Sequence, residues 1–417
     1  MRGLEPNSPV VVLGAGIVGI CTALSLLEKG VPVTLIDKGD PGQETSMGNA
    51  GVVSPWSFIP QALPGIWKSI PKLMFGYGRP LSIHPRSALK MLPWGMRFLH
   101  QSREDRVRAN ATAMSHLCGP SIELYEKHLQ GTGHENLITD SMYVHAFRGG
   151  SRANLSSIDY QIRAELGADL ELVGKNRLAE IEPALGPDFN AAILIKGQAR
   201  MRSPGKLGQV LAEKARRLGA DFRKAAIGGI RRQGTGEWAI ECEGRTLTAQ
   251  RIVICLGAWS PGLLEKVGVS VPLMAERGYH VEFSDPGIVV NNSVMDVDAK
   301  FVASSMEGGV RVAGQAEFAP VDAPPSKQRE TQLIEVAKRA FPDLRMQKTS
   351  FWMGRRPSFP DSLPALGAVK DCPGLFVNFG HSHYGLMMAP KSGDLLSRTI
   401  CNEPANLDQA AYSLDRF

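Results

Sequence analysis

Near its start the chain carries Val10-Val11-Val12-Leu13-Gly14-Ala15-Gly16-Ile17-Val18-Gly19, then a helix-patterned segment to Lys29 and a second apolar run that ends at Asp37. This order predicts a strand, a glycine-rich turn, a helix and a second strand. Gly14 permits the tight turn, Gly16 lets a diphosphate approach the backbone, and Gly19 lets the helix lie close to the sheet. Asp37 stands where an acid accepts hydrogen bonds from ribose hydroxyls. The unit is therefore typical of dinucleotide binding.

Length and composition narrow the class of protein. The 417 residues exceed one nucleotide-binding domain, and the 43% hydrophobic content suits a globular protein with a substantial core. The net charge of +6 includes no dense basic cluster, which argues against a nucleic-acid groove. The six cysteines have no metal-ligand spacing, so we expect reduced core thiols and no metal. Without a signal peptide or a long apolar run, we expect a cytoplasmic protein, with peripheral attachment to the inner face of the cell membrane left open.

Residues 56–93 are unusual because prolines and large apolar side chains alternate there. Prolines this frequent predict short pieces rather than one long helix, whereas residues 95–130 have the pattern of an amphipathic helix. Aromatic and basic residues together suit the surface of an anionic membrane. A lid packed over a substrate domain is the alternative. The residues behind the membrane interpretation are Trp56, Phe58, Trp67, Lys68, Lys72, Phe75 and Arg79.

Several further motifs follow in a fixed order across nearly the whole chain. They are Thr45-Ser46 with Asn49-Ala50-Gly51, the run Ile252 to Trp259, Gly354-Arg355-Arg356-Pro357 with Pro360-Asp361, and Gly380-His381 with Gly385. Together with the N-terminal unit, this series resembles the FAD-dependent amine and amino-acid oxidoreductases of the D-amino-acid oxidase type. Within them it is most similar to bacterial D-amino-acid dehydrogenases, and the similarity extends to enzymes that oxidise D-hydroxyproline.

The positions of these motifs suggest two domains built from alternating segments. Residues 1–55, 203–262 and 350–417 carry the nucleotide-type pattern and are predicted to form an FAD-binding domain. Residues 56–202 and 263–349 are predicted to form a substrate domain, and their alternating apolar residues from 278 to 315 indicate an antiparallel sheet. The expected fold is therefore mixed α/β, with a Rossmann-like FAD-binding domain interleaved with an antiparallel-sheet substrate domain.

The C-terminal motif favours FAD over NAD as the cofactor. Residues 380–385 are predicted to form a turn between a strand and a helix, and the amino end of that helix can stabilise negative charge on a reduced isoalloxazine. A plain structural turn is the alternative. The candidate cofactor contacts are Gly14, Ala15, Gly16, Ile17, Val18, Gly19, Asp37, Lys38, Thr45, Ser46, Asn49, Ala50, Gly51, Gly257, Gly380, His381, Ser382, Tyr384, Gly385 and Leu386.

Three residues are candidates for contact with the substrate. Arg356 occupies the position that binds the substrate carboxylate in the enzymes this chain resembles, and a guanidinium can grip a carboxylate with two parallel hydrogen bonds. Tyr279 falls where similar enzymes carry a residue that closes over the substrate; its hydroxyl could bind the carboxylate, or its ring could simply pack. His383, like His381, could contact the flavin or adjust proton release, or it could be a structural histidine. No catalytic base stands out, and hydride transfer from Cα to the flavin does not require one.

These observations predict FAD-dependent oxidative deamination of D-amino acids, with D-proline and cis-4-hydroxy-D-proline as candidate substrates. The electrons are expected to pass to a quinone or another carrier. Three alternatives are an oxidase of the glycine or sarcosine type that uses dioxygen, a non-catalytic FAD-binding subunit, and an NAD-dependent dehydrogenase. A hydrolase is disfavoured because the chain has no G-x-S-x-G nucleophile elbow.

Overall fold

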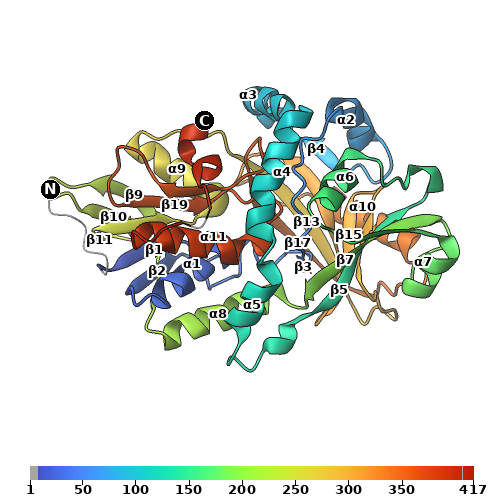
Figure 1. The fold of residues 1–417 in the computed structure, drawn as a ribbon, viewed down its shortest axis with the longest axis horizontal. Coiled ribbons are helices and arrows are strands. Elements are labelled where there is room, and N and C mark those ends of the chain that lie inside the picture. The colour runs from blue at the N-terminus through green and yellow to red at the C-terminus, as the bar shows by residue number, and fades with distance from the viewer. Residues whose placement is uncertain (1–7, 406) are drawn as a thin grey trace.

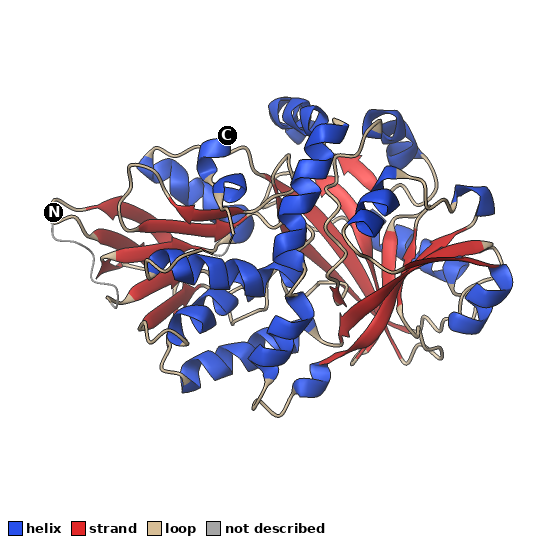
Figure 2. Cartoon of the chain, in the orientation of Figure 1, coloured by secondary structure: helices blue, strands red, loops and turns tan. Residues whose placement is uncertain are grey.

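The structure, a computed structural model, describes residues 8–405 and 407–417. The smaller sheet, with β1 and β19, lies on the left of Figures 1 and 2, and the larger sheet, with β7 and β13, lies on the right, with helices around both. The mixed α/β architecture predicted from the sequence is confirmed. Across the described residues, no helix is both long enough and apolar enough to cross a lipid bilayer.

The smaller sheet has the strand order β18-β19-β12-β1-β2-β8, and its central strand β1 pairs in parallel with β2 and β12. Successive side chains of a strand point to opposite faces. Val10 and Val12 accordingly pack toward helices α1 and α11, whereas Val11 and Leu13 pack toward a three-stranded sheet of β9, β10 and β11. Burial on both faces explains the unbroken apolar run before Gly14. The bounds are β1 Val10–Leu13, β2 Val33–Asp37, β8 Asp221–Lys224, β12 Arg251–Ile254, β18 Ala365–Ala368, β19 Leu375–Phe379, β9 Ile227–Arg232, β10 Trp238–Cys242, β11 Arg245–Ala249, α1 Ile17–Leu27 and α11 Gly385–Ile400.

The larger sheet follows the order β17-β13-β16-β15-β14-β5-β7-β3, with β4 beside β16 and β6 beside β7. Most neighbours are antiparallel as predicted, but β14 with β5 and β16 with β4 are parallel. One face of the sheet packs on helix α10 through Leu333, Val336 and Ala340. The bounds are β3 Val52–Val53, β4 Leu81–Ile83, β5 Ile138–Phe147, β6 Leu170–Gly174, β7 Ala191–Met201, β13 Met274–Ser284, β14 Ser293–Asp296, β15 Phe301–Met306, β16 Gly309–Phe318, β17 Lys348–Ser358 and α10 Lys327–Ala340.

The larger sheet also takes strands from segments that the sequence analysis assigned to the FAD-binding domain. β3 lies in the first of these segments and pairs with β7. β17 lies mostly in the third segment and pairs with β13 along its whole length. The exact limits of the two domains therefore stay a prediction. The larger sheet contains strands from segments of both predicted domains.

The structure confirms one local prediction and corrects another. Residues 56–93 form short pieces as predicted, namely α2, β4 and the start of α3, and Pro71 and Pro93 lie inside the two helices. Residues 95–130 form the end of α3 and two further helices rather than one. The remaining helices are α2 Ile66–Phe75, α3 Pro85–Gln101, α4 Glu104–Cys118, α5 Ser121–Leu129, α6 Ile158–Glu165, α7 Lys175–Ile181, α8 Pro204–Arg217 and α9 Ser260–Leu264.

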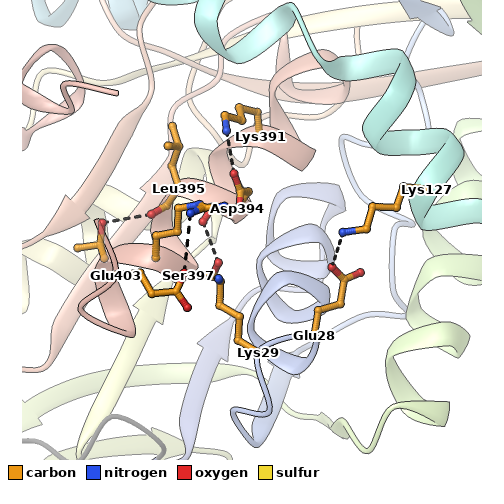
Figure 3. A network of polar contacts seen from close by, with 10 residues as sticks. Glu28, Lys29, Lys127, Lys391, Asp394, Leu395, Ser397 and Glu403 are labelled. Atoms are coloured by element: carbon orange, nitrogen blue, oxygen red, sulfur yellow. Dashed lines mark hydrogen bonds and ion pairs between the residues drawn. The ribbon is translucent and has the colours of Figure 1, made fainter. Parts of the chain in front are cut away.

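A polar network joins the ends of α1, α5 and α11 at the surface (Figure 3). Lys127 Nζ, from α5, donates to Glu28 Oε2 at 3.2 Å, and Lys29 donates to Glu403, just beyond α11. Lys391 pairs with Asp394 within α11. Because these side chains are partly exposed, we expect each pair to contribute less than about 1 kcal/mol. The network fixes helix ends that are distant from the cavity described next.

Candidate active site

A cavity of about 1290 Å³ is lined by residues from both the smaller and the larger sheet. Its walls come from the glycine-rich turn after β1, residues 44–52, strands β13 and β17, and the turn before α11. Sites for ordinary small ligands enclose about 300–1000 Å³. This cavity therefore has room for a dinucleotide and a small substrate together.

The glycine-rich turn is held by close backbone contacts. Gly14 has φ +107°, and a Cβ on it would lie 2.5 Å from the carbonyl oxygen of Cys255. A Cβ on Gly19 would lie 1.9 Å from the carbonyl oxygen of Gly14, so this glycine lets α1 approach the turn. The Asp37 carboxylate accepts hydrogen bonds from the amides of Ala15 (2.7 Å) and Gly39 (2.9 Å). It thereby orders the turn, and it still lines the cavity where a ribose would lie.

Residues 44–51 connect the turn to the larger sheet. Ser46 Oγ accepts a hydrogen bond from the amide of Ile17 (3.0 Å), and Thr45 Oγ1 donates to the carbonyl of Arg355 (3.0 Å). Asn49 Oδ1 accepts from the amide of Gly51 at 2.8 Å. This segment is therefore fixed between the first helix turn and β17, where it can pass along a bound dinucleotide.

The turn before α11 closes the other end of the cavity. Gly380 has φ +87°, and a Cβ there would lie 2.2 Å from the ring of Phe359. Burial lowers the pKa of His381 to about 3, and its Nε2 lies 3.1 Å from Ser392 Oγ. Two cavity-lining polar atoms, Ser382 Oγ and Asn378 Oδ1, are buried without a hydrogen-bond partner. Unpaired buried polar atoms beside a helix amino terminus fit the polar edge of an isoalloxazine.

Most of the predicted cofactor residues come together in this cavity. The cavity-lining ones are Gly14, Gly16, Ile17, Val18, Asp37, Lys38, Thr45, Ser46, Asn49, Ala50, Gly257, Gly380, His381, Ser382, Tyr384, Gly385 and Leu386. Ala15, Gly19 and Gly51 do not line it. Their roles are local: Ala15 binds Asp37, Gly19 packs on Gly14, and a Cβ on Gly51 would lie 2.5 Å from the carbonyl oxygen of Met201. Contact with FAD stays a prediction for each residue.

Arg356 lies on the cavity face of the larger sheet, directly opposite Glu276 on the neighbouring strand. Its Nη1 donates to Glu276 Oε1 (2.9 Å) and to the carbonyl oxygen of Gln315 (2.7 Å). The guanidinium lies flat over Gly278, where a Cβ would be 2.2 Å from its Cζ. Among the described residues, none accepts a hydrogen bond from Arg356 Nε. This edge of the guanidinium is therefore available to a ligand carboxylate.

Glu276 also binds His383. His383 Nε2 donates to Glu276 Oε1 at 2.6 Å, and Ser358 Oγ donates to Glu276 Oε2 at 3.2 Å. Burial alone would raise the pKa of Glu276, but the attraction and hydrogen bond of His383, followed by those of Arg356, hold it at about 2. Its side chain is only 3% exposed. A buried carboxylate thus anchors a guanidinium and an imidazole on the same cavity wall.

Tyr279 faces the opposite side of the sheet from this group. Tyr279, Val281 and Phe283 alternate along β13 and pack in the core that includes α10. The Tyr279 ring stacks on Phe351 at 5.5 Å and its hydroxyl donates to Glu317. Burial and the Glu317 carboxylate raise its pKa to about 12. Although Tyr279 borders the cavity, the structure thus gives its ring a packing role and offers no free hydroxyl for a substrate.

Glu276 is the residue that the sequence analysis missed. It stands only three positions before Tyr279, in the same strand. A charged residue in a strand that is otherwise buried is the available signal, because a buried charge requires a partner. Its partners are 80 and 107 positions away, so the sequence alone does not identify them.

Comparison with protein families gives one match that spans nearly the whole chain. Residues 9–399 match the model of the FAD dependent oxidoreductase family. The chain belongs to this family. It is therefore an FAD-dependent oxidoreductase, and the alternatives of a non-catalytic subunit and of an NAD-dependent dehydrogenase are wrong.

Named relatives cover the chain almost completely. A D-amino-acid oxidase of Bradyrhizobium diazoefficiens is 33% identical over 416 residues, covering 98% of both chains. A D-amino acid dehydrogenase of Rhizobium rhizogenes is 29% identical and covers 98% of this chain and 99% of the relative. Among solved structures, glycine oxidase from Geobacillus kaustophilus has a TM-score of 0.75 at 21% identity, covering 98% of both chains. L-proline dehydrogenase from P. horikoshii also has a TM-score of 0.75, at 18% identity, covering 99% of this chain and 98% of the other. These structural similarities establish the fold.

Proposed function

We propose that this oxidoreductase oxidises the Cα–N bond of D-amino acids. The observation that carries the proposal is the ion pair of Arg356 and Glu276 on the cavity wall, with His383 bound to the same carboxylate. A free amino acid is a zwitterion, and this wall offers a cation for its carboxylate and a carboxylate–imidazole pair for its ammonium. The D-amino-acid names of the two relatives support the same class of substrate.

The flavin supplies the acceptor for the hydride that leaves Cα, and the protein supplies orientation. Arg356 Nη2 donates to the carbonyl oxygen of Gly314 at 3.4 Å and has a second hydrogen, so Nε and Nη2 together can hold the substrate carboxylate through two parallel hydrogen bonds. Gly278 keeps the guanidinium flat against the sheet, because it has no side chain beneath it. A carboxylate fixed in this way presents one face of Cα to the cofactor. We therefore expect strict handedness even if side-chain preference is broad.

D-proline and cis-4-hydroxy-D-proline are the leading substrates in this proposal. The similarity of residues 354–364 to hydroxyproline-oxidising enzymes suggests them. Apolar residues also line the cavity, Leu63, Ile66 and Met91 among them. A compact ring suits such walls, and a secondary amine leaves a cyclic imine after oxidation.

The proposed electron acceptor is a quinone or another carrier, reached at a membrane surface by α2 and α3. These helices expose Trp67, Phe75, Leu89 and Met96, which are 59%, 77%, 81% and 66% exposed. Lys68 and Lys72 stand on α2 beside them. Other apolar residues of both helices line the cavity, so the two helices separate it from the surface. Apolar side chains with neighbouring cations suit an anionic lipid surface. The alternative is a lid with no lipid contact.

An oxidase that uses dioxygen is the second candidate, because the relative with 33% identity is named D-amino-acid oxidase. The two candidates share the substrate site and differ in the reoxidation of the reduced cofactor. A dehydrogenase is reoxidised slowly by air and rapidly by an artificial quinone, whereas an oxidase forms peroxide rapidly in air.

The decisive experiment is anaerobic mixing of the purified flavoprotein with a panel of D- and L-amino acids that includes both proline isomers. We expect loss of the flavin colour with D-amino acids and much slower loss with their L-partners. Faster reduction by the L-partners would overturn the stereochemical proposal. Reoxidation of the reduced enzyme by air or by a soluble quinone then distinguishes the two acceptors.

Flotation with vesicles of anionic lipid at low salt tests the membrane contact. We expect the protein to float with the vesicles, and a Phe75→Ser, Leu89→Ser double variant to stay at the bottom with unchanged flavin content. These side chains are strongly exposed, so the variant should keep its thermal stability. Equal failure of both proteins to float would favour the lid.

A further inference from the structure

His383 occupies a position that hydride transfer by itself does not explain. It stands in the turn before α11, and its side chain is 37% exposed in the cavity although its neighbours His381 and Ser382 are buried. The position of its imidazole is set by a single hydrogen bond to the carboxylate of Glu276 on β13. An imidazole held at a cavity surface by a buried acid is a recurrent arrangement for proton transfer.

The hydrogen bond to Glu276 determines which nitrogen of His383 can react. Glu276 is ionised, so its oxygens can only accept, and Nε2 of His383 must carry the hydrogen. In a neutral imidazole the other nitrogen, Nδ1, then has a free electron pair. No described residue donates a hydrogen bond to Nδ1. The arrangement therefore leaves a proton acceptor at the cavity surface.

The charges around His383 favour a neutral imidazole that can gain a proton. Burial of its surroundings lowers the pKa of His383, and Arg356 from β17 lowers it further, while Glu276 from β13 raises it. Tyr384 follows in the same turn, and Arg163 from α6 and Tyr143 from β5 lie close enough to influence Tyr384. A bound substrate would add its own carboxylate beside Arg356. That carboxylate would offset the effect of Arg356 and favour protonation of His383 when substrate is present.

We propose that His383 is the catalytic base that accepts a proton from the substrate ammonium at Nδ1, with Glu276 as its positioning residue; this inference rests on the proposed function. The N–H bond of the ammonium breaks, its electron pair stays on the substrate nitrogen, and the proton forms the new N–H bond at Nδ1. The resulting imidazolium is stabilised by the Glu276 carboxylate. The freed lone pair can then form the C=N bond as the hydride leaves Cα for the family's cofactor.

This assignment also explains why one carboxylate binds two groups. Glu276 fixes the distance between Arg356 and His383, because both donate to its Oε1. The α-carboxylate and the α-nitrogen of an amino acid are two bonds apart, so their partners must have a fixed spacing. A shared anchor supplies that spacing within one rigid sheet edge and one turn.

The test is the pH dependence of kcat/KM for the flavin-loaded enzyme and for His383→Gln, with D-proline or the best D-amino acid found. Without its base, the variant must bind the small fraction of substrate that is already neutral in solution. We expect a loss of about 100-fold at pH 7, within the usual range for general-base catalysis. The loss should shrink about tenfold for each pH unit toward the pKa of the free ammonium.

A substrate with a more acidic ammonium sharpens the test. Electron-withdrawing fluorine in 3,3,3-trifluoro-D-alanine lowers the pKa of its ammonium relative to D-alanine. The ratio of the wild-type kcat/KM to that of His383→Gln at pH 7 should therefore be much smaller for the fluorinated substrate than for D-alanine. Glu276→Gln should shift the pH profile to lower values, because an amide no longer favours the imidazolium. Glu276→Asp should partly restore the profile.

His145→Gln is the matched control. His145 is another neutral histidine of the cavity wall, but its Nδ1 is bound to the hydroxyl of Tyr160 at 2.7 Å. Its variant should keep the position of the pH profile. A loss in His383→Gln that is equal at every pH, or a profile identical to wild type, would overturn the proposal. If His383→Gln does not retain FAD, two other measurements decide. They are the pH profile of Glu276→Gln and the comparison of D-alanine with 3,3,3-trifluoro-D-alanine as substrates of the wild type. Failure of every amino acid to reduce the wild type would instead reject the proposed function.

Discussion

The two ends of the cavity are built in different ways. At the nucleotide end, Asp37 binds the amide of Ala15 only 22 positions before it, and Gly19 packs on the carbonyl of Gly14. At the end where Arg356 lies, Glu276 binds Arg356 and His383, which are 80 and 107 positions away. The first end is therefore a local motif, and the second is a product of strand pairing. Local motifs are recognisable in one sequence, whereas pairings across a sheet are not.

The largest expected effect concerns the end of the cavity that the glycine-rich turn forms. Gly14→Ala combines a left-handed φ with a Cβ only 2.5 Å from the Cys255 carbonyl oxygen, so we expect a loss of stability of about 3–5 kcal/mol and little flavin in the purified protein. Gly30→Ala is the control, because Gly30 also has a positive φ but no neighbour within 4 Å. It should cost about 1 kcal/mol. Denaturant unfolding and the visible flavin spectrum measure both, and equal effects would show that the contact with Cys255 is unimportant.

The second effect concerns the end made by strand pairing. Arg356→Lys keeps the charge but loses the fork that grips a carboxylate, and Arg356→Ala also leaves Glu276 with one partner fewer. We expect kcat/KM for amino acids to fall by the equivalent of about 2–4 kcal/mol in both variants, with FAD retained. Steady-state kinetics and the flavin spectrum are the measurements. Near-normal turnover of Arg356→Ala would contradict the carboxylate clamp.

A smaller effect is expected from a substitution of Gly278, the residue on which the Arg356 guanidinium rests. In Gly278→Ala the new methyl group would lie 2.2 Å from the Arg356 Cζ, so the guanidinium must move. We expect a loss of about 1–3 kcal/mol in kcat/KM, mostly through KM, because binding geometry is disturbed while the charge remains. Gly234→Ala, with no neighbour within 4 Å, is the control and should behave like wild type. Equal kinetics of the two variants would show that the flat position of Arg356 is not needed.

The smallest effect is expected outside the cavity. His128 and Lys127 hold the pKa of Glu28 at about 2, against an ordinary value of 4.5. His128 Nδ1 is 3.7 Å from Glu28 Oε1, which is beyond hydrogen-bond distance, so we expect less than about 1 kcal/mol from this group. Because the folded pKa is depressed, its stabilisation is present above pH 4.5 and is lost as the pH falls toward 2.

Unfolding of wild type and Glu28→Gln between pH 7 and pH 3 measures this contribution. The difference between them should be small at pH 7 and should narrow as the pH falls, with kcat/KM unchanged. A change in kinetics would mean that the network in Figure 3 reaches the cavity, contrary to the separation of the two regions.

The local pattern of apolar residues and glycines predicted more of the helices and strands than of the contacts in the candidate active site. The strands at 10–13 and 33–37 and the helix at 17–27 lie where the order of apolar runs and glycines placed them. The prolines correctly predicted short pieces, but Pro71 and Pro93 do not end a helix, because they are accommodated inside α2 and α3, two helices with little burial. There, a lost backbone hydrogen bond can be replaced by solvent.

The sequence by itself determined the dinucleotide unit, the choice of FAD and the importance of Arg356, which the structure places on the cavity wall. In each case the necessary residues are adjacent, or fall in motifs whose order is preserved. Only the tertiary structure decided that Glu276 and not Tyr279 directs its side chain to the cavity. The physical reason is the two-residue period of a strand, which sends neighbouring side chains to opposite faces. Which face is which depends on the register of β13 with β17 and on the helix packed behind them.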